Sequence, residues 1–121
     1  MKKGSINLVN NGRSDYQIVI SHNASNTVKH SASELKAFLK RISGADVPIA
    51  LDDKPITDHE ILLGNNRHLQ QNKPVINENS FAIFTDDKNL SIMGKQDQAT
   101  LYGVYTFLEK YLFRWRQVIE V

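Results

Sequence analysis

Two pairs of adjacent aspartates are the first candidates for chemistry, Asp52-Asp53 and Asp86-Asp87. Hydrolysis by acid-base catalysis needs two carboxylates held about 5 to 10 Å apart across a substrate cleft. Adjacent aspartates in turn sequences instead hydrogen-bond the nearby backbone, and successive side chains of extended chain point to opposite sides. We therefore expect all four aspartates to be solvated turn residues.

The histidines offer no second ligand or partner. They are scattered along the chain as His22, His30, His59 and His68. His59-Glu60 begins like the zinc-peptidase motif, but the position four residues after His59 holds Leu63 where that motif needs a second histidine. We expect four isolated surface histidines and no metal site.

Other catalytic patterns are also missing. No serine lies in a Gly-x-Ser-x-Gly elbow, and Gly94-Lys95 continues with Gln96 instead of the Ser or Thr of a phosphate loop. The chain has no cysteine, which excludes a thiol nucleophile, a disulfide and a Cys-ligated zinc. The sequence therefore predicts no catalytic residue and no cofactor in these 121 residues.

An aromatic segment over residues 101–115 stands out instead. Tyr102, Tyr111 and Trp115 lie off the apolar stripe of this segment, and Arg114 lies beside Trp115. Exposed aromatic rings can pack against another domain. They can also stack on sugar rings while a nearby arginine bonds the hydroxyls. We expect these four residues to make either an interdomain contact or a glycan contact.

Two amphipathic helices must position these residues. The first is predicted over residues 27–42 from apolar side chains at helical spacing, Val28, Ala32, Leu35, Phe38, Leu39 and Ile42. Ser25 or Asn26 can cap its start, and Gly44 can end it in the left-handed conformation. The second is predicted from about residue 98 to 112 from the stripe Leu101, Val104, Tyr105, Leu108 and Leu112. Gly103 inside it indicates a close approach of this helix to the sheet.

The remaining segments read as strands. Residues 5–9 and 16–20 alternate around Asn10-Asn11-Gly12 and favour two strands that could form a hairpin. Residues 47–51 suit an edge strand or the beginning of a strand, and the apolar run 60–64 suits a central strand covered on both faces. Residues 81–85 and 90–93 flank a turn and predict a hairpin. The order of elements predicts an α+β fold, with two helices packed on one mixed sheet.

Composition excludes several classes of protein. With 40% hydrophobic and 23% charged residues, the chain should bury a core, and 121 residues suit one domain over 1–121. A net charge of +2 is too small for a dedicated nucleic-acid binder, so Lys36, Lys40 and Arg41 are expected to form a solvated helix face. No apolar run approaches the roughly 18 residues that cross a bilayer. We expect neither a nucleic-acid nor a membrane partner.

Several pieces of the chain, in order, resemble the N-terminal domain of bacterial α-glucuronidases and related glycoside hydrolases. The pieces are residues 35–48, 61–64, 80–83, 90–94 and 100–109, followed by Arg114-Trp115. This resemblance implies an accessory α+β domain, similar to the second domain of β-N-acetylhexosaminidases and to folds named zincin-like. It implies that the chain is part of a longer one, in which a catalytic (β/α)-barrel follows and carries the catalytic carboxylates. It also implies an extracytoplasmic location.

Overall fold

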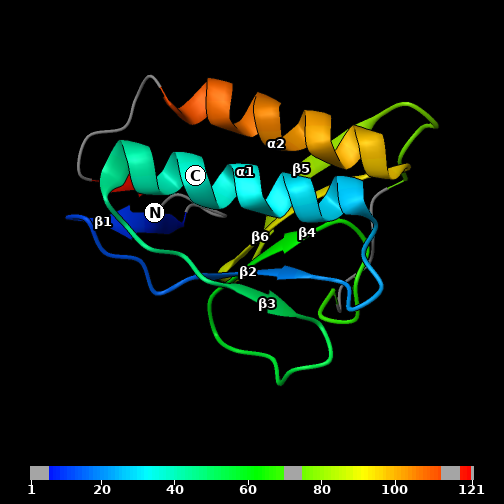
Figure 1. The fold of residues 1–121 in the computed structure, drawn as a ribbon. Coiled ribbons are helices and arrows are strands. Elements are labelled where there is room, and N and C mark those ends of the chain that lie inside the picture. The colour runs from blue at the N-terminus through cyan, green and yellow to red at the C-terminus, as the bar shows by residue number, and fades with distance from the viewer. Residues whose placement is uncertain (1–5, 70–74, 113–117, 121) are drawn as a thin grey trace.

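The computed structural model describes residues 6–69, 75–112 and 118–120. Two helices lie side by side on one face of a mixed five-stranded sheet, as predicted (Figure 1). In chain order the elements are β1 (Asn7–Asn10), β2 (Gln17–Ile20), α1 (Asn26–Ser43), β3 (Ile49–Leu51), β4 (Glu60–Leu63), β5 (Phe81–Asp86), β6 (Asn89–Gly94), α2 (Asp97–Leu112) and β7 (Val118–Glu120).

The five-stranded sheet has the order β3-β2-β4-β6-β5. Its first four strands run parallel to their neighbours, and β5 pairs antiparallel with β6. The central place of β4 agrees with its sequence, because all four of its residues are buried, as expected of a strand whose two faces are both covered. The predictions of an edge strand at β3 and of a β5–β6 hairpin are also confirmed.

The hairpin expected between the first two strands is wrong. Asn11 and Gly12 do turn the chain, with φ of 56° and 79°, but β1 then pairs antiparallel with β7 in a separate two-stranded sheet. β2 instead lies between β3 and β4. Ile18, Val19 and Ile20 are all buried, so β2 needs cover on both faces, which an interior strand of the larger sheet receives.

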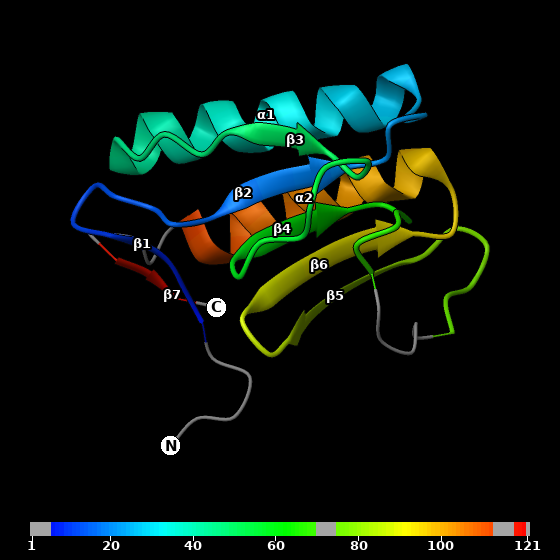
Figure 2. The ribbon, with the colours of Figure 1, turned by 90° about the horizontal axis from the view of Figure 1, so that it is seen from below.

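The core lies between the sheet and the two helices. α1 packs over β2 and β4, and α2 packs over β6 and β5; Figure 2 shows the strands in front of α2. The predicted caps of α1 are confirmed, since the Ser25 side chain accepts from the backbone N–H of Val28 and Gly44 has φ 80°. The largest fully buried apolar side chains of this core are Leu8, Ile18, Leu35, Leu39, Ile61, Leu63, Leu90, Ile92 and Phe107.

Helix α2 approaches the sheet closely at Gly103, as predicted. A Cβ atom at this position would lie 2.8 Å from Ile92 Cγ2 and 3.2 Å from a ring carbon of Phe81. The predicted stripe of α2 needs one correction. Tyr105 is not a core residue, because its side chain is exposed, and Phe107 is buried in the core instead.

Candidate functional site: the exposed aromatic face and the buried carboxylates

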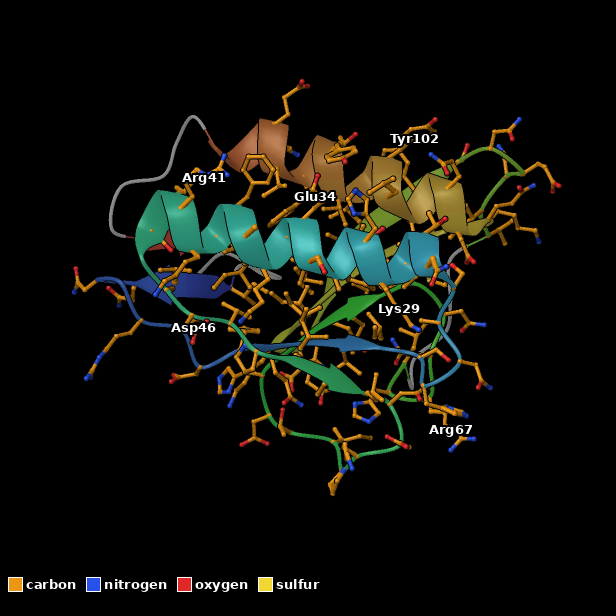
Figure 3. All side chains as sticks on the ribbon, in the orientation of Figure 1. Lys29, Glu34, Arg41, Asp46, Arg67 and Tyr102 are labelled. Atoms are coloured by element: carbon orange, nitrogen blue, oxygen red, sulfur yellow. The ribbon has the colours of Figure 1, made fainter. Side chains whose placement is uncertain are left out.

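The side of α2 that faces away from the sheet exposes two tyrosines. Tyr102 is 54% exposed and Tyr105, almost one helical turn later, is 40% exposed. Figure 3 shows Tyr102 on the side of α2 opposite the sheet, with Glu34 on the neighbouring α1. Tyr102 and Tyr105, with Glu34, define what we name the tyrosine face.

The tyrosine face joins the two helices. Tyr105 Oη donates to Glu34 Oε1 at 3.0 Å, and His30 Nε2 lies 3.7 Å from the same oxygen. The hydrogen bond to the Glu34 carboxylate raises the pKa of Tyr105, with smaller contributions from burial and from the negative charge. The ring of Tyr105 is therefore held in place, whereas the Tyr102 hydroxyl makes no hydrogen bond to another of the described residues.

The other predicted contact residues are only partly covered by the structure. Tyr111 lies within α2, and its side chain is outside the described residues, as are Arg114 and Trp115. Tyr105 was missed as a candidate because its spacing also suits the apolar stripe of the helix. The signal available in the sequence was Tyr102, which lies three residues earlier at an exposed position.

The basic face of α1 makes local contacts. Lys36 Nζ donates to Asp46 Oδ1 at 2.9 Å and to the carbonyl oxygen of Val47 at 3.0 Å. The hydrogen bond from Lys36, followed by its charge, lowers the pKa of Asp46. The Arg41 guanidinium lies over the Phe38 ring at 5.1 Å.

Asp52 is not a solvated turn residue; this prediction is wrong. Its carboxylate is buried at the carboxyl ends of β2, β3 and β4. Oδ1 accepts from the backbone N–H of His22 at 2.8 Å and lies 2.9 Å from His22 Nδ1, while Oδ2 accepts from the backbone N–H of Arg67 at 2.8 Å. Asp53 and Asp87 are exposed as predicted, and Asp86 is half-buried in β5.

The pKa of Asp52 shows that these hydrogen bonds outweigh burial. Burial alone raises the pKa of a carboxyl group, because water no longer stabilises its charge. The bonds from Arg67 and His22, and the charge of the His22 ring, lower it to about 2. The charged Asp52 side chain thus links, by hydrogen bonds, three segments that follow three neighbouring strands.

Glu60 and His68 form a second buried cluster, which corrects the prediction of four isolated surface histidines. His68 Nδ1 lies 2.9 Å from Glu60 Oε1, and His68 Nε2 lies 2.8 Å from the carbonyl oxygen of Lys54. Both side chains are almost completely buried. Of the other two histidines, His30 is exposed, and the half-buried His59 ring meets Tyr16 edge to face at 5.1 Å.

Comparison with known proteins identifies the family. The sequence model described as glycosyl hydrolase family 67 N-terminus matches residues 7–107. The chain belongs to this family. Among curated protein sequences, none matches the chain.

The fold of this glycosyl hydrolase family 67 N-terminal domain is also found in a solved structure. A GH138 enzyme targeting pectin rhamnogalacturonan II matches with a TM-score of 0.53 and 18% sequence identity, over 87% of this chain and 15% of that enzyme's chain. At this identity the likeness concerns the fold alone. The family 67 domain therefore spans a small part of the length of this structural relative.

The acidic side chains of the described part of this family 67 domain include two buried ones. Asp52 and Glu60 are buried, and their oxygens accept several hydrogen bonds from neighbouring segments. Within residues 6–69, 75–112 and 118–120, no group of three or more His, Asp or Glu side chains could hold a metal ion. In the same ranges, no helix is long and apolar enough to cross a membrane. Tyr102 and Tyr105 are the two tyrosines among the exposed large hydrophobic side chains of these ranges.

Proposed function

We propose that residues 1–121 form a non-catalytic accessory domain of an α-glucuronidase-like glycoside hydrolase. In this proposal the domain supports a catalytic barrel in the same chain, and the barrel carries the acids that cleave the glycosidic bond. The observation that carries it is membership of the family 67 N-terminal domains over residues 7–107. The buried carboxylates of Asp52 and Glu60 agree with this proposal, since both link separate loops by hydrogen bonds.

The tyrosine face is the contact we propose for the catalytic domain. Tyrosine suits such a contact because its ring offers apolar area while its hydroxyl tolerates water before the contact forms. Tyrosines are also enriched at protein interfaces relative to other surfaces. Tyr105 is already ordered by Glu34, so docking immobilises one side chain fewer. Tyr111, Arg114 and Trp115, whose side chains lie outside the described residues, stay predicted contact residues.

Hydrolysis assays test the proposed division of labour. We expect the purified 121-residue chain to release no product from aryl-glycosides or glucuronoxylan fragments. A chain that also carries the proposed barrel should hydrolyse glucuronoxylan fragments. The accessory role would be contradicted if the pure 121-residue chain hydrolysed these substrates and Tyr102→Ser left the rate unchanged.

A second candidate function rests on the spacing of the two exposed tyrosines. Tyr102 and Tyr105 project from nearly the same side of α2, and such a pair could stack on successive sugar rings. Affinity electrophoresis in gels containing different polysaccharides separates the two candidates. Retardation that Tyr102→Ser removes would favour a glycan-binding module, whereas equal mobility in all gels would favour the interdomain contact.

A further inference from the structure

The Glu60–His68 cluster lies on the face of the sheet opposite the helices. Glu60 precedes Ile61, whose side chain belongs to the core under the helices, so the Glu60 side chain points to the other face. There it meets the two segments that follow β3 and β4, residues 52–59 and 64–69. The accessory role proposed above makes no use of this cluster.

The hydrogen bonds of Glu60 restrict where a proton can sit. Oε2 accepts from Gln17 Nε2 at 3.1 Å, from the backbone N–H of Thr57 at 3.0 Å and from Thr57 Oγ1 at 3.3 Å. An oxygen that accepts three hydrogen bonds has no free position for a proton. Any proton on this carboxyl group must therefore lie on Oε1; His68 Nδ1 lies 2.9 Å from Oε1 and 3.0 Å from Oε2.

The hydrogen bonds of His68 complete the assignment. Nε2 faces the carbonyl oxygen of Lys54, which can only accept, so Nε2 carries a hydrogen. Nδ1 and Glu60 Oε1, 2.9 Å apart, then need one proton between them. The pair has no net charge whether that proton is drawn on Nδ1 or on Oε1. Without it, a nitrogen lone pair would face a carboxylate in a site that water does not reach.

We propose that Glu60 and His68 share one proton that the folded chain keeps at a pH where the unfolded chain has released it. In an unfolded chain, glutamate is ionised and histidine loses its second ring proton at about pH 6.5. Above that pH the folded state binds one proton more than the unfolded state. The contribution of the pair to the free energy of unfolding is then fully present below about pH 6.5 and falls as the pH rises. The pair therefore stabilises the contact between the two segments that it joins in a pH-dependent way.

The surroundings of the pair support this proton count. β2 contributes the neutral Gln17, and β6 contributes Asn89, whose Oδ1 accepts from the backbone N–H of Glu60 at 3.0 Å. Residues 52–59 contribute Thr57 and a backbone carbonyl group. The charged groups next along the chain are occupied elsewhere or exposed. Asp52 binds His22 and the backbone of Arg67, and the His59 ring meets Tyr16 edge to face. The side chains of Lys54, Asp58 and Arg67 are exposed.

Glu60→Gln is the variant that removes the shared proton while keeping the shape of the side chain. Its amide oxygen can still accept from Thr57 and Gln17, and its NH₂ group can donate to a neutral His68 Nδ1. Urea unfolding between about pH 7 and 8 compares the two chains. One bound proton corresponds to a tenfold rise in the unfolding constant per pH unit. We expect about this rise in the wild-type chain relative to Glu60→Gln.

Glu34→Gln is the matched control. Glu34 also lies near a histidine, His30, but on the surface and at 3.7 Å. We expect this variant to keep the pH dependence of the wild-type chain. Equal pH dependence in the wild-type chain and Glu60→Gln would overturn the proposal.

A measurement on the wild-type chain keeps the proposal testable if Glu60→Gln does not fold. Nitrogen chemical shifts of the His68 ring should stay constant from about pH 6 to 8, because the folded pair keeps its proton over this range. Amide exchange at His68 and Thr57 should accelerate as the pH rises, by more than the chemistry of exchange alone requires. A His68 ring that titrates between about pH 6 and 7 would overturn the proposal.

Discussion

At the scale of single residues, hydrogen bonds to backbone groups decide what the acidic side chains do. Asp52 and Asp53 are adjacent and chemically identical, yet Asp52 is buried and Asp53 is exposed. Asp52 accepts two backbone N–H groups, and both would lose their partner without it. Because a buried unsatisfied donor costs about 1 to 3 kcal/mol, Asp52 is expected to be a stability determinant.

Replacing Asp52 by Asn should lower the free energy of unfolding by about 2 kcal/mol at neutral pH, since an amide accepts on one atom only. The pKa of Asp52 is lowered to about 2 in the folded chain, below the ordinary aspartate value of 3.8. Its contribution is therefore present above about pH 4 and lost as the pH falls towards about 2. Urea unfolding at the two pH values measures this loss.

Asp53→Asn is the control for this prediction, because it makes the same chemical change one residue away at an exposed position. We expect it to leave the free energy of unfolding within about 0.5 kcal/mol of the wild-type value. Equal effects of the two substitutions on the free energy of unfolding would show that Asp52 does not stabilise the three segments it contacts. The sequence alone could not separate the two residues, since the partners of Asp52 lie 30 and 15 positions away.

At the scale of elements, sequence patterns correctly predicted the features that depend on residues close together in the chain. The caps at Ser25 and Gly44, the β5–β6 hairpin and the buried run of β4 all depend on short stretches of chain. The pairing of β1 with β7 joins segments about 110 residues apart, and no local signal reports such a contact. The turn at Asn11-Gly12 favoured a hairpin, and the need to bury both faces of β2 overrode it.

Gly103→Ala tests the close approach of α2 to the sheet. Alanine is favoured over glycine by about 1 kcal/mol within a helix, so an unhindered substitution would stabilise the chain. Here the new Cβ would lie 2.8 Å from Ile92 Cγ2, with the Phe81 ring also close, and both neighbours are packed. Because overpacking costs about 1 to 3 kcal/mol, we expect a net loss of about 1 kcal/mol in thermal or urea unfolding.

Thr106→Ala on the exposed side of the same helix is the comparison. It adds helix propensity without a steric conflict and should leave stability unchanged or raise it by a few tenths of a kcal/mol. A stabilising effect of Gly103→Ala as large as that of an exposed helix position would contradict close packing at Gly103.

At the scale of the whole molecule, the two sides of the sheet have different tasks. The helix side buries the apolar core and presents the tyrosine face outward, while the other side carries the Glu60–His68 cluster under two loops. The α+β class and the layer of two helices could be predicted from hydrophobic periodicity. The buried polar clusters could not, because their members come from three or more separate segments.

The tyrosine face should matter to the longer chain and not to the isolated domain. Tyr102→Ser removes an exposed ring, so we expect the free energy of unfolding of the 121-residue chain to change by less than about 0.5 kcal/mol. In a chain that also carries the proposed catalytic domain, the same substitution should remove part of a buried contact and lower the melting temperature of this domain. Gln98→Ser, one turn earlier and also exposed, should change neither chain. Calorimetry on both chains distinguishes the cases, and equal melting of the longer chain with and without Tyr102 would place the interdomain contact elsewhere.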